Sequence, residues 1–583
     1  MTHLKTTARS LSMALVATLV LAGCAPSAAP SAPASAPAQP PATAATAAPP
    51  TPTPPIQTLP RIETPTPAAA RPGPATPTPA SAEKPRYGGI LTAYESSEPT
   101  SLDVNQETTI FTLQNQTSVY NGLLEVDPTR LPDRVITGDL AEKWSASPDG
   151  KTWTFTLKSG VTFHDGKPLT SADVAFTLDR MKTGPGKIKT PFKELFEAVN
   201  KVETPDAQTA RVVLNRPLTY FAILIANPAL SIMPKHILEK DQNALEQKSL
   251  GSGPFMFKAW NKNVSIELAR NPNYFKKGLP YLDGIRWITL REPATQIAAL
   301  RTGRVVFGGH GTRGLSKREA DLLEKDIPGV QISRYSTDSE QYLLVNTRRK
   351  PLDDIRVRKA IFNALNQQNV IDTAYQGAGF KGGYLPPGEW ALPEAELNKM
   401  PPYRGPTQAD LDEAKKLLAD AGFPRGLTLE MLQPHLYEPM TLTVAADLRK
   451  AGIETKIRVV QYPVEWIPLV TKSNYDLSIG PTVFALYDPD AYMKNALTGD
   501  SENYTGMSSP EVDALYQKQA GIVDFAERKK VADQLQLKVW EMRSHFPPFW
   551  VMYFHAALPQ VKGWTGPGRL RDNFRYEHIW LAQ

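Results

Sequence analysis

Apolar residues at every second position predict a hairpin in the first third of the chain. Five large apolar side chains alternate with polar ones on either side of a Ser159-Gly160 turn signal: Trp153, Phe155, Leu157, Val161 and Phe163. Period-two alternation places such residues on one face of a strand. We therefore expect two strands within residues 153–163 that pair with each other and bury one face.

A later stretch alternates between strand and helix patterns. Residues 427–431 and 453–459 carry the alternation of strands, and residues 437–451 between them carry helical spacing that ends at Gly452. A strand, a helix and a second strand in this order predict a parallel pair with a right-handed crossover.

Two further helix starts are marked by a Thr that is followed three residues later by Asp. This capping-box spacing opens residues 170–181 and residues 407–422, and it predicts a helix in each. Hairpins and crossover units in separate stretches indicate an α/β protein with several lobes.

Composition and charge exclude several classes of protein. The 583 residues include one Cys and carry a net charge of +6, with no run of basic residues interleaved with aromatics. A nucleic-acid partner is therefore not expected. One Cys also excludes internal disulfides and thiolate metal clusters.

The amino terminus has the layout of an export signal. Lys5 and Arg9 precede an apolar stretch at residues 11–21, which is too short to span a bilayer. The end of the stretch, Leu-Ala-Gly-Cys24, resembles the lipobox of bacterial lipoproteins, which implies a signal peptide over 1–23 and Cys24 as a lipid anchor. The alternative is a secreted protein that is cleaved at an A-x-A site, with Cys24 incidental.

Residues 24–83 predict a disordered tether. The segment is almost entirely Ala, Pro, Ser and Thr, and it contains 18 of the 54 prolines of the chain. Such a composition has too little apolar surface to offset the entropy of an ordered backbone.

The remaining residues show little sign of covalent chemistry. No phosphate-binding loop, nucleophile elbow or paired-histidine motif occurs. His164-Asp165 and His310 are expected in loops. Asp488-Pro489-Asp490 predicts a turn with capping oxygens, although two close carboxylates also suit acid-base chemistry or a hard cation. We expect no catalytic residue, no metal and no cofactor.

Taken in order, the patterned segments resemble one family. Residues 139–144 and 147–181 are similar to the signature stretch of the bacterial extracellular solute-binding proteins of family 5, the peptide and nickel receptors of ABC importers. Shorter segments match in the same order: 251–255, 270–274, 282–285, 346–347, 354–360 and 410–423.

The resemblance implies an α/β, two-lobed periplasmic-binding-protein fold, the Venus flytrap, with an extra subdomain inserted in lobe one. In such a fold the two lobes close about a hinge when a ligand binds between them, so the conformation of the protein depends on whether the site is occupied. The implied boundaries are 84–126, 248–337 and 548–583 for lobe one, 127–247 for the inserted subdomain, and 338–547 for lobe two.

The resemblance also implies a ligand site between the lobes. The expected ligand-binding residues are Tyr94, Glu95, Ser96, Ser97, Glu98, Trp390, Phe484, Tyr487, Asp488 and Asp490. Peptide receptors of the family place an acidic residue where this chain has Leu486. The departure predicts weak recognition of a free amino terminus, unless Asp488 or Asp490 takes over that role.

We therefore expect a monomeric, lipid-anchored receptor on the outer side of the cell membrane, either in the periplasm or on the outer surface of the plasma membrane. It would deliver an oligopeptide or similar small polar solute to an ABC permease that works with separate ATPase subunits. A nickel chelate or an oligosaccharide is the alternative ligand. A secreted hydrolase that uses paired carboxylates is the alternative from another class.

Overall fold

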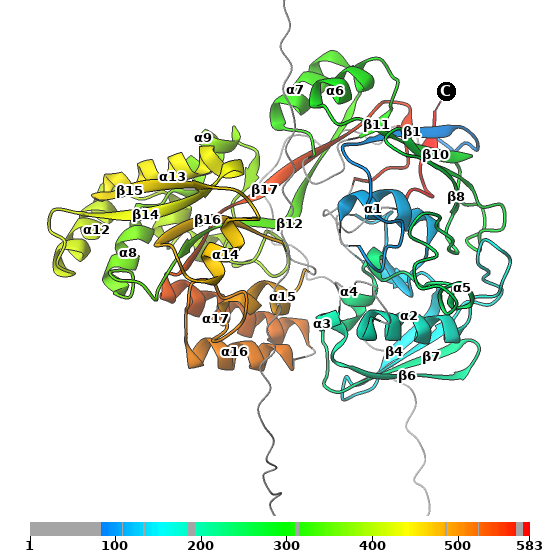
Figure 1. Ribbon diagram of the computed structural model, residues 1–583, viewed down its shortest axis with the longest axis horizontal. Coiled ribbons are helices and arrows are strands. Elements are labelled where there is room, and N and C mark those ends of the chain that lie inside the picture. The colour runs from blue at the N-terminus through cyan, green and yellow to red at the C-terminus, as the bar shows by residue number, and fades with distance from the viewer. Residues whose placement is uncertain are drawn as a thin grey trace, which may run out of the picture. The chain divides into compact units, whose positions relative to one another are not determined.

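The computed structural model (Figure 1) describes residues 83–582, apart from 108, 132–134, 185–192, 309–313, 484–486, 523 and 567–574. The predicted signal peptide, Cys24 and nearly all of the predicted tether lie outside the described residues. The same is true of His310, Phe484 and Leu486.

An 11-stranded mixed sheet organises the described residues. Its two longest strands, β12 and β17, pair antiparallel along much of their length, while β1 is parallel to both of its neighbours. In spatial order the strands are β15 (Ile453–Val460), β14 (Leu427–Pro434), β16 (Leu477–Val483), β12 (Gln331–Val345), β17 (His545–Ala557), β11 (Phe307–Gly308), β1 (Ile90–Glu95), β10 (Gly284–Thr289), β9 (Ser265–Arg270) and β8 (Phe255–Asn261), and β13 (Gly379–Phe380) also pairs with β17.

A second sheet of four antiparallel strands corrects the predicted hairpin. Its order is β4 (Ala141–Ala146), β5 (Thr152–Leu157), β7 (Thr209–Leu214) and β6 (Val199–Asp206). The hairpin within 153–163 is wrong, because β5 pairs with β4 and β7 instead. Val161 and Phe163 are buried as predicted, but they lie in the loop that follows β5. Apolar residues can alternate in a sequence because a loop buries every second side chain, so the pattern alone does not distinguish a buried loop from a strand.

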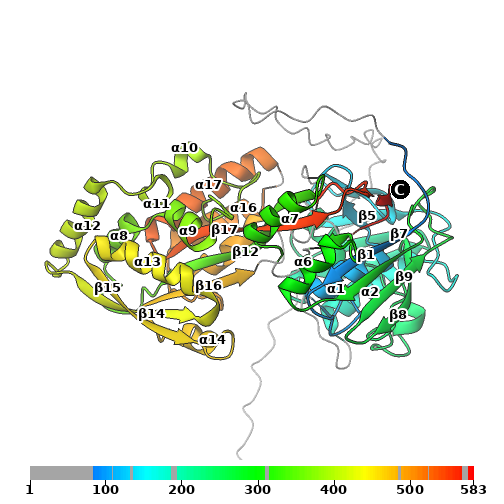
Figure 2. The ribbon, with the colours of Figure 1, turned by 90° about the horizontal axis from the view of Figure 1, so that it is seen from above.

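The predicted helix starts and the crossover unit are confirmed. Capping boxes open α2 (Ser171–Thr183) and α12 (Gln408–Asp420). Strands β14 and β15 are parallel and flank α13 (Glu438–Lys450) in the chain. Figure 2 shows α13 beside these strands, with α8 (Ile355–Ala364) and α12 beyond it.

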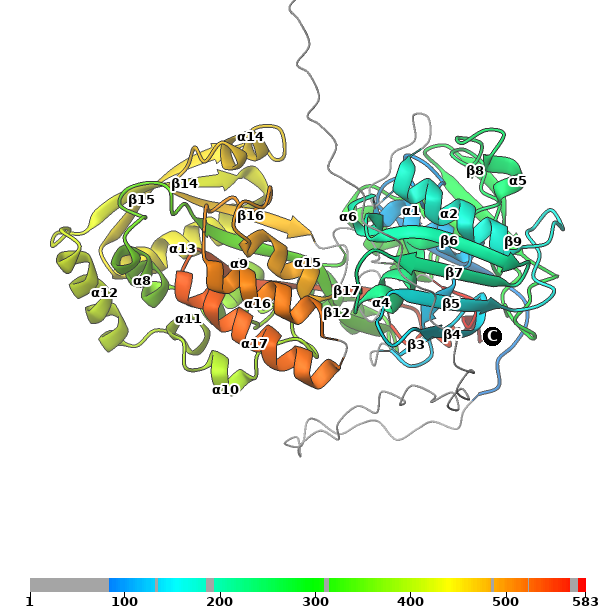
Figure 3. The same ribbon diagram turned by 90° about the horizontal axis from the view of Figure 1, so that it is seen from below.

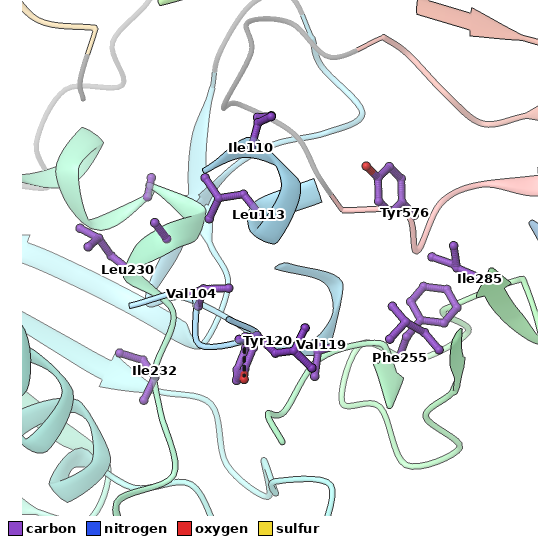
Figure 4. Close-up of a cluster of buried hydrophobic side chains, with 14 of the residues drawn as sticks. Val104, Ile110, Leu113, Val119, Tyr120, Leu230, Ile232, Phe255, Ile285 and Tyr576 are labelled. Carbon is purple, nitrogen blue, oxygen red and sulfur yellow. Dashed lines mark hydrogen bonds between the residues drawn. The ribbon is translucent and has the colours of Figure 1, made fainter. Parts of the chain in front are cut away.

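Buried apolar side chains form three clusters. The first core takes its residues from 91–335 and 554–579, the second from 343–551 and the third from 342–550. Figure 4 shows part of the first core, where Ile110 and Leu113 lie close to the segment that carries Leu230.

The remaining elements are short connections and covering helices. Figure 3 shows α16 and α17 side by side. The two-stranded pairs are β2 (Leu124–Val126) with β3 (Ile136–Gly138), and β18 (Val561–Lys562) with β19 (Trp580–Leu581). The helices not yet named are α1 (Ile110–Gln116), η1 (Thr117–Val119), α3 (Lys193–Phe196), α4 (Phe221–Ile225), η2 (Pro228–Leu230), α5 (Lys235–Leu238), α6 (Pro293–Arg301), α7 (Lys317–Asp326), α9 (Gln367–Tyr375), α10 (Glu394–Leu397), α11 (Pro401–Arg404), η3 (His435–Tyr437), α14 (Trp466–Thr471), α15 (Pro489–Met493), η4 (Lys494–Ala496), α16 (Pro510–Ala520) and α17 (Phe525–Met542).

Candidate functional site

Glu95, the last residue of β1, is a buried carboxyl group. Its side chain accepts hydrogen bonds from Asn115 Nδ2 at 2.8 Å and from Thr289 Oγ1 at 3.3 Å. Burial raises the pKa of Glu95 to about 8, against the lowering effect of these bonds. Glu95 is therefore mostly protonated at neutral pH and presents a neutral polar group.

Tyr94 precedes Glu95 and packs into the first core. Its ring lies against Gly308 of β11, where a Cβ atom would stand 2.0 Å from the Tyr94 ring. The position of the ring thus depends on the absence of a side chain at residue 308. The structure places Tyr94 as a packing residue of the sheet.

The loop after β1 contains Ser96, Ser97 and Glu98, all half-buried. Glu98 accepts hydrogen bonds from Trp260 Nε1 at 3.1 Å and from the backbone N–H of Asn263 at 2.5 Å. These contacts attach the loop to the turn between β8 and β9. Within the described part of the chain, the hydroxyls of Ser96 and Ser97 make no hydrogen bond, so they remain available.

Asp488 and Asp490 share one buried arginine. Arg528 of α17 donates two hydrogen bonds to Asp488, at 2.6 and 2.7 Å, and one to Asp490 at 3.3 Å. Asp488 also accepts from the backbone N–H of Asp490 and caps α15, and Gln519 donates to Asp490. The prediction of a turn with capping oxygens is confirmed.

Burial and the neighbouring Asp488 raise the pKa of Asp490 to about 6, although Arg528 acts in the opposite direction. Arg528 contacts both carboxylates, Arg216 also favours the charged form of Asp490, and Asp490 is bound less closely by Arg528 than Asp488 is. No group of three potential metal-ligating side chains occurs among the described residues.

Two of the predicted aromatic contacts, Trp390 and Tyr487, lie in the third core. The Trp390 ring packs on Phe525, with centroids 4.8 Å apart, and the Arg528 guanidinium lies 5.0 Å from its centroid. The Tyr487 hydroxyl donates to the carbonyl of Pro386 at 3.3 Å. Both aromatic side chains are almost fully buried.

The structure therefore gathers the described site residues into two groups, one at the end of β1 and one around Arg528. Arg528 was missed from the sequence, although a signal exists, because it precedes the buried apolar Val531, Ala532 and Leu535 at helical spacing. Asn115 was also missed, since its contact with Glu95 depends on how α1 packs on the sheet.

The histidine that sequence places in a loop is found there. His164 Nε2 lies 3.0 Å from the carbonyl oxygen of Gly253, and the adjacent Asp165 lies 2.7 Å from His236 Nε2. These partners join the loop to neighbouring segments.

The described helices include none with the length and apolar character needed to cross a bilayer.

Solved structures match nearly the whole of the described chain. The periplasmic binding protein DppA of Helicobacter pylori, in complex with the peptide STSA, has a TM-score of 0.68 and 24% identity, and the match covers 85% of this chain and 99% of that one. The oligopeptide-binding protein AppA of Bacillus subtilis, in complex with a nonapeptide, has a TM-score of 0.65 and 23% identity over 86% and 100%. The predicted α/β periplasmic-binding-protein fold is confirmed.

A curated relative is more similar in sequence but matches over a shorter length. The glutathione-binding protein GsiB of Salmonella typhi is 28% identical over 344 residues. The match covers 58% of this chain and 63% of the relative, so it spans less than two thirds of that protein.

A family model settles the class of protein. The model of the bacterial extracellular solute-binding proteins, family 5 Middle, matches residues 135–504. Members of this family are non-catalytic, extracytoplasmic binding proteins, so the alternative of a secreted hydrolase is excluded. The chain belongs to family 5 of the bacterial extracellular solute-binding proteins.

Proposed function

We propose that this protein is the substrate-binding component of an ABC importer and that it delivers a peptide or a peptide-like solute to a membrane permease with separate ATPase subunits. The observation that carries the proposal is the match, over almost their full length, to structures that hold peptides. The relative GsiB is named for glutathione, which is itself a small peptide.

The division into lobes is part of this proposal. Lobe one would comprise the first core with the inserted four-stranded sheet, and lobe two the second and third cores. Strands β12 and β17 contribute residues to all three cores, which suits a connection that bends when a ligand is enclosed.

We assign different roles to the two groups of site residues. Ser96 and Ser97, whose hydroxyls are available, would contact the solute directly, together with Phe484. The other groups would hold those loops in position, because their polar atoms or rings already have partners within the protein. They are the half-buried Glu98 and the buried Tyr94, Glu95, Trp390, Tyr487, Asp488 and Asp490.

The engagement of Asp488 and Asp490 by Arg528 bears on which peptides bind. A buried ammonium group requires a carboxylate partner to offset its desolvation. The carboxylates of Asp488 and Asp490 already form ion pairs with Arg528. With Leu486 at the position of the usual acid, we expect a free amino terminus to add little affinity.

The test uses calorimetry and thermal denaturation with glutathione and with a tripeptide in free and amino-terminally acetylated forms. A ligand at a hundredfold excess over its Kd is expected to add about 2.7 kcal/mol to the free energy of unfolding. Acetylation should weaken binding by less than about tenfold, or about 1.4 kcal/mol.

Two results would contradict these expectations. A large acetylation penalty that disappears in Asp488→Asn or Asp490→Asn would show that these carboxylates read the amino terminus. Stabilisation by a nickel chelate or an oligosaccharide, with none by any peptide, would replace the peptide by another solute class.

The lipid anchor is proposed on the sequence alone. Because one acyl chain gives only marginal membrane binding and a lipoprotein terminus carries several, Cys24→Ser is expected to move the protein from the membrane to the soluble fraction. Cell fractionation and immunoblotting measure the change. A variant that is processed normally and stays with the membrane would rule out Cys24 as the anchor.

A further inference from the structure

A cavity of about 340 Å³ lies in the segment that follows β13. Its lining includes Glu394 and Leu397 of α10 and Tyr403 of α11; Figure 2 shows where these two short helices lie in the chain. Its size is at the lower end of the range for small-molecule sites. Buried apolar side chains line it from one side: Leu392, Leu397 and Tyr403.

The wall of this cavity is held by buried hydrogen bonds. The side-chain amide of Gln367 donates to the carbonyl of Gly382 at 2.9 Å and accepts from its N–H at 3.2 Å. Trp550 Nε1 of β17 donates to the carbonyl of Gly383 at 3.2 Å. A wall that is already fixed lowers the entropic cost of binding.

Two opposite charges line the cavity without pairing with each other. The Lys381 ammonium contacts only the carbonyl of Tyr403, at 3.5 Å, among the described residues. Glu394 and Asn398 make no side-chain hydrogen bond or ion pair within the same part of the chain. Lys381, Glu394 and Asn398 are all solvent-exposed, so a cation, an anion and a neutral amide line the cavity beside its buried apolar side chains.

We propose that this cavity is a second small-molecule site, which binds a zwitterion with a short apolar side chain, such as a free aliphatic amino acid. Lys381 would receive the ligand carboxylate and Glu394 its ammonium group, while Leu392 and Leu397 pack on the side chain. Each charge of such a ligand meets its opposite, and the apolar part is removed from water.

The cavity is distinct from the proposed solute site. Gly388 and Ala391 line it, but the ring of the intervening Trp390 packs on Phe525 and Arg528 instead. The proposal stands independently of the transport function, because none of the nine described residues assigned to the solute site lines the cavity.

The experiment is a titration of the full-length protein with L-leucine, N-acetyl-L-leucine and L-leucinamide, followed by saturation-transfer NMR. The acetylated ligand lacks the ammonium group and the amide lacks the carboxylate, so both should bind more weakly than leucine. Lys381→Met is expected to remove the preference for leucine over leucinamide, and Glu394→Gln the preference over N-acetyl-leucine. Each variant should weaken leucine binding by about threefold or more.

Lys399→Met serves as the matched control, since Lys399 is exposed nearby and pairs with Glu396 outside the cavity lining. This variant should leave all three affinities unchanged. Ala391→Phe should fill the cavity and abolish leucine binding. No binding of leucine up to about 10 mM, or binding that Lys381→Met and Glu394→Gln leave unchanged, would overturn the proposal.

Discussion

Replacing Arg528 with methionine is expected to lower the free energy of unfolding by about 3–5 kcal/mol. The Arg528 side chain is 4% exposed and the Asp488 side chain 0%, so the substitution leaves a buried carboxylate without its guanidinium partner. Asp490 loses a hydrogen bond at the same time. Urea denaturation of the purified variant and the unchanged protein measures the difference.

The chain offers a matched control for this effect. Arg356 and Asp354 form an ion pair at the same 2.6 Å separation, but their side chains are 47% and 27% exposed. Arg356→Met should cost less than about 1 kcal/mol, because solvent already screens that pair. Asp488→Asn combined with Arg528→Met should be more stable than Arg528→Met alone. Equal losses for the two single arginine variants would show that burial does not determine the cost.

Glu95→Gln is expected to make the protein more stable at high pH. The pKa of Glu95 rises from 4.5 to about 8 on folding, so the folded state holds its proton more tightly than the unfolded state. This contribution to stability is complete below pH 4.5, declines towards pH 8 and is absent above it. The shift corresponds to roughly 5 kcal/mol.

The comparison is made by urea denaturation at pH 5 and at pH 9. Glutamine keeps an acceptor for Asn115, its amide N–H can donate to the Thr289 hydroxyl, and it has no proton to lose. The variant should therefore match the unchanged protein within about 1 kcal/mol at pH 5 and exceed it by roughly 2–4 kcal/mol at pH 9. Glu203→Gln, at an exposed position, is the control. A pH dependence that persists unchanged in Glu95→Gln would assign the effect to other groups.

The sequence predicted correctly those helices and strands whose ends and apolar periodicity depend only on residues close by in the chain. The crossover unit of β14, α13 and β15 is of this kind, as are the capping boxes of α2 and α12. The hairpin prediction failed because strand pairing is not local, and β5 finds its partners in β4 and in β7, about fifty residues further along the chain.

The apolar alternation that predicts strand β15 does not report burial. Ile457 and Val459 alternate as a strand should, yet they are 38% and 58% exposed. Strand β15 is at the edge of the sheet, and that position depends on the order of all the strands. Within the site, the sequence identified Asp488 and Asp490 but not Arg528, since the helix that carries it follows them by some forty residues.

The distribution of the three cores has a consequence for how the chain folds. Every residue of the second and third cores comes from one uninterrupted stretch, 342–551, whereas the first core requires residues from 91 to 579. During synthesis, which proceeds from the amino terminus, every residue of the second and third cores is present once residue 551 has been added. At that point the first core still lacks the end of β17 and the residues that follow it. Since domains tend to fold as units in the order in which they are completed, the later part of the sequence can finish folding first, and the earlier part must wait for the last thirty or so residues.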